Sequence, residues 1–183
     1  INSTRNVTVS SFNVKIEVEQ HYQQSEAINK SIMTATISAI DFYVPELIYD
    51  NKYFSKILET DEDWIAERTG ILTRRIAQNE ATSDLIAKAA VRCLSTRGLD
   101  AAEVDCIIVG TITPDYPFPA TSAVVQAKIE AKNAWGFDIS AACCGFNFGL
   151  VLAAKLVETG AARRVLVCGG DKMSSVTDYQ DRR

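Results

Sequence analysis

The sequence contains little histidine and no excess of positive charge, and each shortage excludes a class of function. His21 is the only histidine among the 183 residues, and the five cysteines, at positions 93, 106, 143, 144 and 168, show no metal-ligand spacing. We therefore expect no metal site. The net charge is -4 and the pI is near 5.1. This balance argues against general nucleic-acid binding, because that function requires a basic face.

The sequence also lacks an apolar run of membrane-spanning length and the residue order of a signal peptide. An odd number of cysteines without a secretory signal favours reduced thiols and the cytosol. Apolar residues make up 47% of the chain, which is enough for the core of one compact domain. We expect a cytoplasmic protein with no membrane segment.

Residues 1–32 differ in composition from the rest of the chain. They are rich in Asn, Ser and Gln, and Val14, Ile16 and Val18 alternate like one face of a strand. Met33 follows and would be a natural start. We predict that residues 1–32 are an extension and that residues 33–183 form the structured domain. A small accessory hairpin in residues 1–32 is the alternative.

From residue 34 onward the pattern alternates between strands and helices. This order predicts a mainly parallel sheet with right-handed crossovers, and therefore an α/β fold. Thr60 is expected to cap the second helix and Gly70 to end it. Cys93 lies on an apolar helical stripe and Cys106 begins a continuous apolar run, so both are expected in the core. The expected strands are 34–40, 104–111, 135–140 and 164–168, and the expected helices are 53–58, 61–67, 83–96, 121–131 and 144–157.

The most informative segment runs from Asp138 to Phe146 and reads Asp-Ile-Ser-Ala-Ala-Cys-Cys-Gly-Phe. Its small residues leave room only for a tight turn between a strand and the helix that follows. A cysteine on such a turn meets the free N–H groups and the positive end of the helix dipole, which favour its thiolate form. Cys143 would then suit the role of a nucleophile that forms a thioester. A buried structural cysteine is the other interpretation, and spacing alone does not separate the two.

Residues 138–146 resemble the active-site segment of β-ketoacyl-acyl-carrier-protein synthase III, a thiolase-fold enzyme that starts fatty-acid chains. The resemblance assigns Cys143 as the residue that takes the acyl group. Cys144 stands where the family commonly has a small residue, so the vicinal pair is a departure. The resemblance runs from about residue 35 to the end of the chain. Further blocks resemble the family in the same order, and they are residues 37–46, 60–71, 104–113, 118–120 and 178–182.

This resemblance implies a thiolase-like α/β fold of which the chain supplies the N-terminal half. It also implies an acyltransferase that moves an acyl group from acyl-CoA onto cysteine and condenses it with malonyl-acyl-carrier protein. The implied partners are acyl-CoA, the acyl-carrier protein and a second copy in a homodimer. No cofactor is implied, since the coenzyme A thioester is a substrate.

The resemblance also implies roles for residues outside the cysteine segment. Thr60, Trp64, Arg68 and Arg182 match positions that line the coenzyme A nucleotide site, and Phe118 matches a residue that reaches across the dimer interface towards the partner's acyl pocket. From the residues alone, Trp64 and Arg68 share a helix face and could equally be a surface tryptophan and a solvated arginine. Phe118 could equally cover its own core. Arg74 and Arg75 form a small basic spot that is expected in a solvated loop, and the alternative is that it meets coenzyme phosphates or an acidic carrier protein.

In the family, a His and an Asn of the second half assist decarboxylation of the malonyl group. No histidine follows His21 in this chain. We therefore expect residues 1–183 to be inactive in condensation, and to expose an apolar sheet edge and the face that the second half would cover. Three alternatives stay open: a sister thiolase-fold condensing enzyme of secondary metabolism, a non-catalytic dimerising fragment, and a thiol-redox protein built on Cys143 and Cys144.

Overall fold

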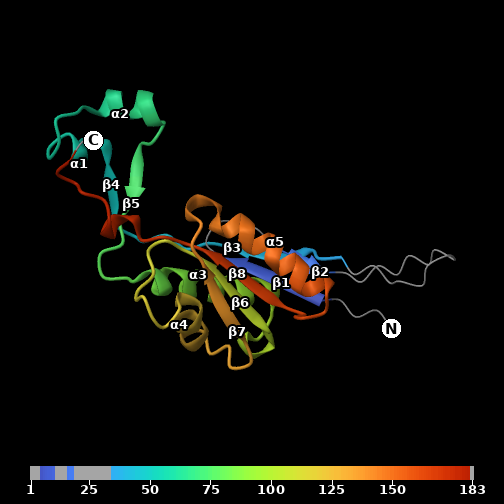
Figure 1. Ribbon diagram of the computed structural model, residues 1–183. Helices are drawn as coiled ribbons and strands as arrows, with labels where there is room; N and C mark the ends of the chain where they lie inside the picture. The colour runs from blue at the N-terminus through green and yellow to red at the C-terminus, as the bar shows by residue number, and fades with distance from the viewer. Residues whose placement is uncertain (1–4, 11–15, 19–33, 182–183) are drawn as a thin grey trace. The chain divides into compact units, whose positions relative to one another are not determined.

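The computed structural model describes residues 5–10, 16–18 and 34–181, and the chain divides into two compact units (Figure 1). The first unit comprises residues 1–43 and 82–171, and the second comprises residues 44–81 and 172–183. Each unit is described by itself below.

The first unit is built on a six-stranded sheet with the strand order β3-β2-β1-β8-β6-β7 (Figure 1). The pairs β1–β8, β8–β6 and β6–β7 are parallel, whereas β1–β2 and β2–β3 are antiparallel. The expected α/β fold with a mainly parallel sheet is therefore confirmed. The strands are β1 (Arg5–Ser10), β2 (Ile16–Val18), β3 (Ile37–Asp41), β6 (Cys106–Gly110), β7 (Trp135–Ile139) and β8 (Val165–Gly169).

Helices cover both faces of this sheet, with α5 on one face and α3 and α4 on the other (Figure 1). Every residue of β6 and β8 is buried, because alternate side chains enter the two helical layers. Ile107 packs with the α3 and α4 layer, and its neighbour Ile108 packs with the α5 layer. The helices of this unit are α3 (Thr82–Arg97), α4 (Thr121–Lys128) and α5 (Gly145–Glu158), with the 3-10 turns η1 (Ala101–Glu103) and η2 (Ala142–Cys144).

The predicted core cysteines are confirmed. Cys93 on α3 and Cys106 on β6 both have 0% exposure. Burial raises the pKa of the Cys106 thiol to about 12, and the negative charge of Asp105 adds to the effect. A thiol held protonated in the core does not act as a nucleophile, so packing is the role that the structure gives Cys106.

The sheet differs from the sequence-based expectation at one of its edges. β1 and β2 lie within the predicted extension, and β1 pairs with β8 over Val7–Ser10 and Val165–Cys168. The strand β8 is thus flanked on both sides, by β1 and by β6. No apolar edge is left open at β8. The assignment of residues 1–32 as an extension stays a prediction, and Val14 lies outside the described residues.

Helix α5 packs on the sheet through a face of mainly small residues. Its buried residues are Gly145, Gly149, Ala153 and Val157, spaced four apart. The larger apolar residues face outward instead: Phe148 is 53% exposed, Val151 is 60% exposed and Leu152 is 41% exposed. The small face is buried because it lets the helix approach β6 and β8 closely. Large apolar side chains therefore remain exposed on the outer face of α5.

The second unit contains a two-stranded antiparallel hairpin of β4 (Ile48–Asp50) and β5 (Thr73–Arg75). Between these strands lie α1 (Asn51–Phe54) and α2 (Glu62–Thr69), and the 3-10 turn η3 (Met173–Ser175) follows later in the chain. The N-cap of α2 is Asp61, whose carboxylate accepts from the Trp64 N–H at 2.7 Å, so the expected cap at Thr60 is wrong by one residue. Gly70 ends α2 with φ 69°, as expected.

None of the helices in the described part of the chain combines the length and apolarity required to cross a membrane.

Candidate active site and coenzyme pocket

Cys143 lies on the turn that joins β7 to α5, as the sequence predicts. The turn passes through the 3-10 segment Ala142–Cys144, and α5 begins at the next residue, Gly145. Both Cys143 and Cys144 are free and exposed. Ala142 has φ 45°, a left-handed conformation that is unfavourable for a residue with a Cβ. The backbone is thus held in an uncommon conformation directly before the candidate nucleophile.

Close packing fixes the start of α5 behind this turn. A Cβ on Gly149 would lie 2.8 Å from Cγ1 of Val167, so a larger residue there would push the helix off the sheet. A Cβ on Gly169 would likewise lie 2.8 Å from Cβ of Phe146. Because the helix cannot shift without these clashes, the position of the Cys143 turn is set by the core.

Asp138 of the same motif has a structural role that the sequence did not reveal. Its carboxylate accepts the backbone N–H of Thr121 at 2.6 Å and that of Ser122 at 2.8 Å. These are the first two residues of α4, which has no cap from its own preceding residue, Ala120. Asp138 therefore caps α4 from the end of β7. This contact ties the strand that leads to Cys143 to a neighbouring helix.

Carboxylates also tie down the loops at the ends of β6 and β8. Asp171 Oδ1 accepts from Thr111 Oγ1 at 2.9 Å and from the Ile112 N–H at 2.8 Å. Asp115 accepts the Ser83 N–H at 3.0 Å and so caps the first turn of α3. Parallel strands end at one edge of a sheet, which is where α/β proteins place their sites. Cys143 lies at this edge, within a frame of hydrogen-bonded loops.

Phe118 lies in the loop between β6 and α4 and is 88% exposed. This exposure rules out the interpretation that its ring covers the core of its own unit. The predicted role at a dimer interface stays a prediction.

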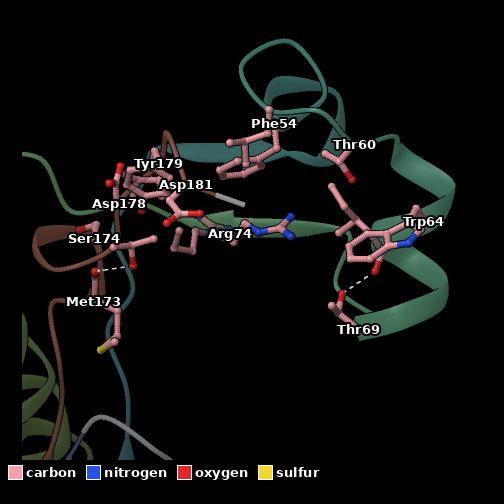
Figure 2. A pocket seen from close by; sticks show the side chains of 15 residues that line it. Phe54, Thr60, Trp64, Thr69, Arg74, Met173, Ser174, Asp178, Tyr179 and Asp181 are labelled. Atoms are coloured by element: carbon pink, nitrogen blue, oxygen red, sulfur yellow. Dashed lines mark hydrogen bonds between the residues drawn. The ribbon is translucent and has the colours of Figure 1, made fainter. Parts of the chain in front are cut away.

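The second unit contains a pocket of about 420 Å³ (Figure 2). Thr60 and Trp64, two of the four residues expected at a coenzyme A site, line it. The Thr60 hydroxyl is buried and has no hydrogen-bond partner among the described residues. The indole of Trp64 is 41% exposed. Other lining residues come from α1, α2, β5, η3 and the segment after η3, and include Phe54, Ile65, Arg74, Arg75, Met173, Asp178 and Tyr179.

Arg68 and Arg182, the other two expected coenzyme residues, are placed differently. The Arg68 guanidinium carbon lies 5.9 Å from the centroid of the Trp64 ring, a cation–π contact beside the pocket and not in its lining. Arg182 lies outside the described residues. The structure thus brings Thr60, Trp64 and Arg68 together in one unit. Cys143 belongs to the other unit.

Arg74 was expected in a solvated loop, and this expectation is wrong. It lies in β5 and is half-buried, with its guanidinium carbon 4.6 Å from the Phe54 ring centroid. Arg75 is exposed, and its Nη1 donates to the Pro45 carbonyl at 3.1 Å. The two neighbours differ because alternate residues of a strand point to opposite faces.

Within the described ranges, no group of three or more His, Cys, Asp or Glu side chains is arranged to hold a metal ion.

Comparison with known proteins agrees with the resemblance carried by the cysteine segment. Residues 137–183 match the family described as 3-Oxoacyl-[acyl-carrier-protein (ACP)] synthase III. A β-ketoacyl-[acyl-carrier-protein] synthase III of Koribacter versatilis (strain Ellin345) is 48% identical over 153 residues, which are 83% of this chain and 46% of that protein.

Two solved structures show the same fold. The 3-oxoacyl-[acyl-carrier-protein] synthase III of Aquifex aeolicus VF5 matches with a TM-score of 0.76 and 41% identity, over 78% of this chain and 46% of that one. The priming β-ketosynthase of the R1128 polyketide biosynthetic pathway matches with a TM-score of 0.75 and 39% identity, over 78% and 43% of the two chains. The α/β fold described above is thus thiolase-like.

The chain belongs to the β-ketoacyl-acyl-carrier-protein synthase III family of condensing enzymes. It spans somewhat less than half the length of the relatives it matches, at 46% of the Koribacter protein.

Proposed function

We propose that the protein is an acyltransferase of fatty-acid chain initiation, and that Cys143 accepts the acyl group from acyl-CoA. The observation that carries this proposal is the exposed Cys143 at the entry to α5, in a chain that is 48% identical to a synthase III. The sheet edge and the packed start of α5 hold the thiol in a fixed position, which a nucleophile requires.

The proposed transfer is an exchange of thioesters. The Cys143 thiolate attacks the carbonyl carbon of acyl-CoA and forms the new C–S bond. The tetrahedral intermediate then collapses, the bond to the coenzyme sulfur breaks, and coenzyme A leaves as its thiolate, which takes a proton from water.

The coenzyme would bind in the pocket of the second unit. Thr60 and Trp64 line this pocket, and Arg68 lies beside Trp64. Stacking of adenine on the indole and pairing of phosphates with guanidinium groups fit these residue types. Arg182 would join this site, following the family resemblance.

The steps after acyl transfer, the assembly and the cellular location are inferred from the resemblance to the synthase III family. We propose that the acyl-enzyme condenses with malonyl-acyl-carrier protein, that the whole protein forms a homodimer in which Phe118 reaches the partner, and that it works in the cytoplasm. The 88% exposure of Phe118 supports an interface role for this loop.

A sister condensing enzyme of secondary metabolism is the second candidate. The similarity to the R1128 priming β-ketosynthase, at 39% identity, is close to that of the Aquifex protein, at 41%. Fold and sequence identity therefore do not distinguish the two candidate functions. The carrier protein with which the enzyme works, that of fatty-acid synthesis or that of a secondary pathway, would distinguish them.

Mass spectrometry of the intact chain tests the primary proposal. The chain is mixed with acetyl-CoA, and the mass of the protein and the free coenzyme A are measured. We expect one acetyl group per chain and an equal amount of coenzyme A released. Cys143→Ala should abolish both signals. No adduct on the wild-type chain, under conditions in which coenzyme A binds, would contradict the proposal.

A further inference from the structure

The side chain of Arg74 is held in one orientation by two contacts within the second unit. Its Nη1 donates to Asn51 Oδ1 at 2.5 Å, and its guanidinium carbon lies 4.6 Å from the centroid of the Phe54 ring. A guanidinium that is stacked on a ring and hydrogen-bonded at one corner has lost most of its rotational freedom. It is therefore pre-organised before any ligand arrives.

Asn51 is itself fixed, so the contact it makes with Arg74 is not adaptable. Asn51 is 4% exposed, and its Nδ2 donates to the Ile71 carbonyl at 2.9 Å and to the Glu62 carbonyl at 3.5 Å. With its N–H groups directed at carbonyls, the amide must present its oxygen to Arg74. The resulting chain of contacts runs from the α2 region through Asn51 to the guanidinium.

The fixed guanidinium belongs to the pocket lining and retains unused donors. A guanidinium carries five N–H donors. Among the described residues, the Arg74 guanidinium donates one hydrogen bond, to Asn51. Figure 2 shows it below Phe54 and pointing towards Trp64, with Asp178 and Asp181 at the opposite end of the pocket. The two carboxylates repel an anion, so the Trp64 end of the pocket is where an anionic group is favoured.

We propose that Arg74 is a phosphate-recognition residue of this pocket and pairs with a phosphate of the bound nucleotide. Fixed, planar and partly desolvated donors match phosphate oxygens better than a mobile surface lysine does. The inference rests on the proposed coenzyme A function, and it adds Arg74 to the residues that the family resemblance supplied. The 3′-phosphate and the diphosphate of the coenzyme share the chemistry that Arg74 would recognise.

The test compares ligand binding to the 183-residue chain and to two variants by calorimetry. Arg74→Gln removes the proposed phosphate partner, and Lys52→Gln is the control, since Lys52 is an exposed cation on α1 of the same unit and lies outside the pocket lining. The probes are coenzyme A, 3′-dephospho-coenzyme A, adenosine 3′,5′-bisphosphate and adenosine. A charge-assisted hydrogen bond of the usual strength predicts a loss of roughly 10- to 100-fold in coenzyme A affinity for Arg74→Gln, and less than about threefold for Lys52→Gln.

The adenosine measurement separates recognition from structure. Arg74→Gln should leave adenosine affinity within about twofold of wild type, whereas collapse of the pocket would weaken every probe equally. If the variant loses its preference for coenzyme A over the dephospho form, Arg74 reads the 3′-phosphate. If that preference persists while both affinities fall, it reads the diphosphate.

Two results would overturn the inference. One is coenzyme A affinity unchanged in Arg74→Gln, and the other is an equal loss for adenosine and for coenzyme A. Failure of the proposed function gives a different pattern. The wild-type chain then does not bind coenzyme A but binds adenosine 3′,5′-bisphosphate, and Arg74→Gln weakens that binding. A wild-type chain that binds none of the phosphate probes would refute both.

Discussion

Gly110 at the end of β6 lies in backbone contact with Gly145 at the start of α5. A Cβ built on Gly110 would lie 2.6 Å from the carbonyl carbon of Gly145 and 2.9 Å from the nitrogen of Phe146. Real Cβ atoms do not approach backbone this closely. The pair therefore lets the strand end and the helix start meet directly behind Cys143 and Cys144.

Replacing Gly110 with Ala should destabilise the first unit and move the start of α5. The new methyl group meets backbone atoms that cannot rotate away, and overpacking of this kind costs about 3 kcal/mol. Gly98→Ala is the control, because Gly98 has φ 66° and open space around its Cβ position, so only backbone strain of about 1 kcal/mol applies. Urea unfolding measures both. A smaller loss for Gly110→Ala than for Gly98→Ala would show that the contact is not tight.

Replacing Trp64 with Ala should impair the use of acyl-CoA more than the use of the carrier-protein substrate. Only acyl-CoA presents an adenine to the indole, and loss of such stacking costs roughly 1–3 kcal/mol by analogy with bases stacked on aromatic residues. Steady-state kinetics with each substrate in turn, on the whole protein that carries this chain, makes the comparison. Trp135→Phe is the control, since Trp135 is also exposed, at 48%, but lies on β7. Equal losses for the two substrates in Trp64→Ala would indicate a structural tryptophan.

The Cys106 thiol should make the chain less stable at alkaline pH. Its pKa is about 12 in the folded chain against 9.0 for an unperturbed thiol. Below pH 9 both states keep the proton and stability is unaffected. As the pH rises from 9 to 12, only the unfolded chain loses the proton, so unfolding becomes more favourable.

This pH effect has a defined size and a simple control. At pH 10.5 the free energy of unfolding should have fallen by about 2 kcal/mol through Cys106 alone, from 1.36 kcal/mol per pH unit. Cys106→Ala should lose that much less between pH 8.5 and pH 10.5, as measured by urea unfolding at both values. Identical pH dependence in the two proteins would contradict a raised pKa.

Residues 1–183 on their own should not condense acyl-CoA with malonyl-acyl-carrier protein. In the family a His and an Asn assist the decarboxylation, and this chain has no histidine after His21. The assay is release of labelled carbon dioxide from malonyl-acyl-carrier protein, with a full-length synthase III as positive control. Carbon dioxide release or a β-ketoacyl product above background from the purified chain would refute this prediction.

The sheet of the first unit could be predicted from the sequence because its strands and helices have simple periodic patterns. The run that begins at Cys106 is apolar at every position, which indicates burial on both faces, and the structure confirms it. The hairpin of β4 and β5 was missed because each strand has only three residues, and Arg74 and Arg75 are charged. Strands this short are set by tertiary contacts and leave no period in the sequence.

The sequence predicted where the candidate site lies, but not the hydrogen bonds and packing that hold it in place. The sequence placed Cys143 at a turn before a helix, since small residues and a following helical pattern are local signals. It could not show that Asp138 caps α4 or that Asp115 caps α3, because these contacts join residues far apart in the sequence. Asp138 lies 17 residues from Thr121, and Asp115 lies 32 residues from Ser83. The sequence pattern also could not show which face of α5 is buried, because Phe148 and Val151 are the larger apolar residues, yet close packing buries the face of small residues.

The central claim is that Cys143 takes the acyl group, and peptide mapping after incubation with acyl-CoA tests it most directly. Both Cys143 and Cys144 are exposed, so reagent access does not decide between them. Tandem mass spectrometry of the peptide that contains both cysteines should place the acyl group on Cys143. Labelling should persist in Cys144→Ala and disappear in Cys143→Ala. Acylation that survives in Cys143→Ala and is lost in Cys144→Ala would contradict the account.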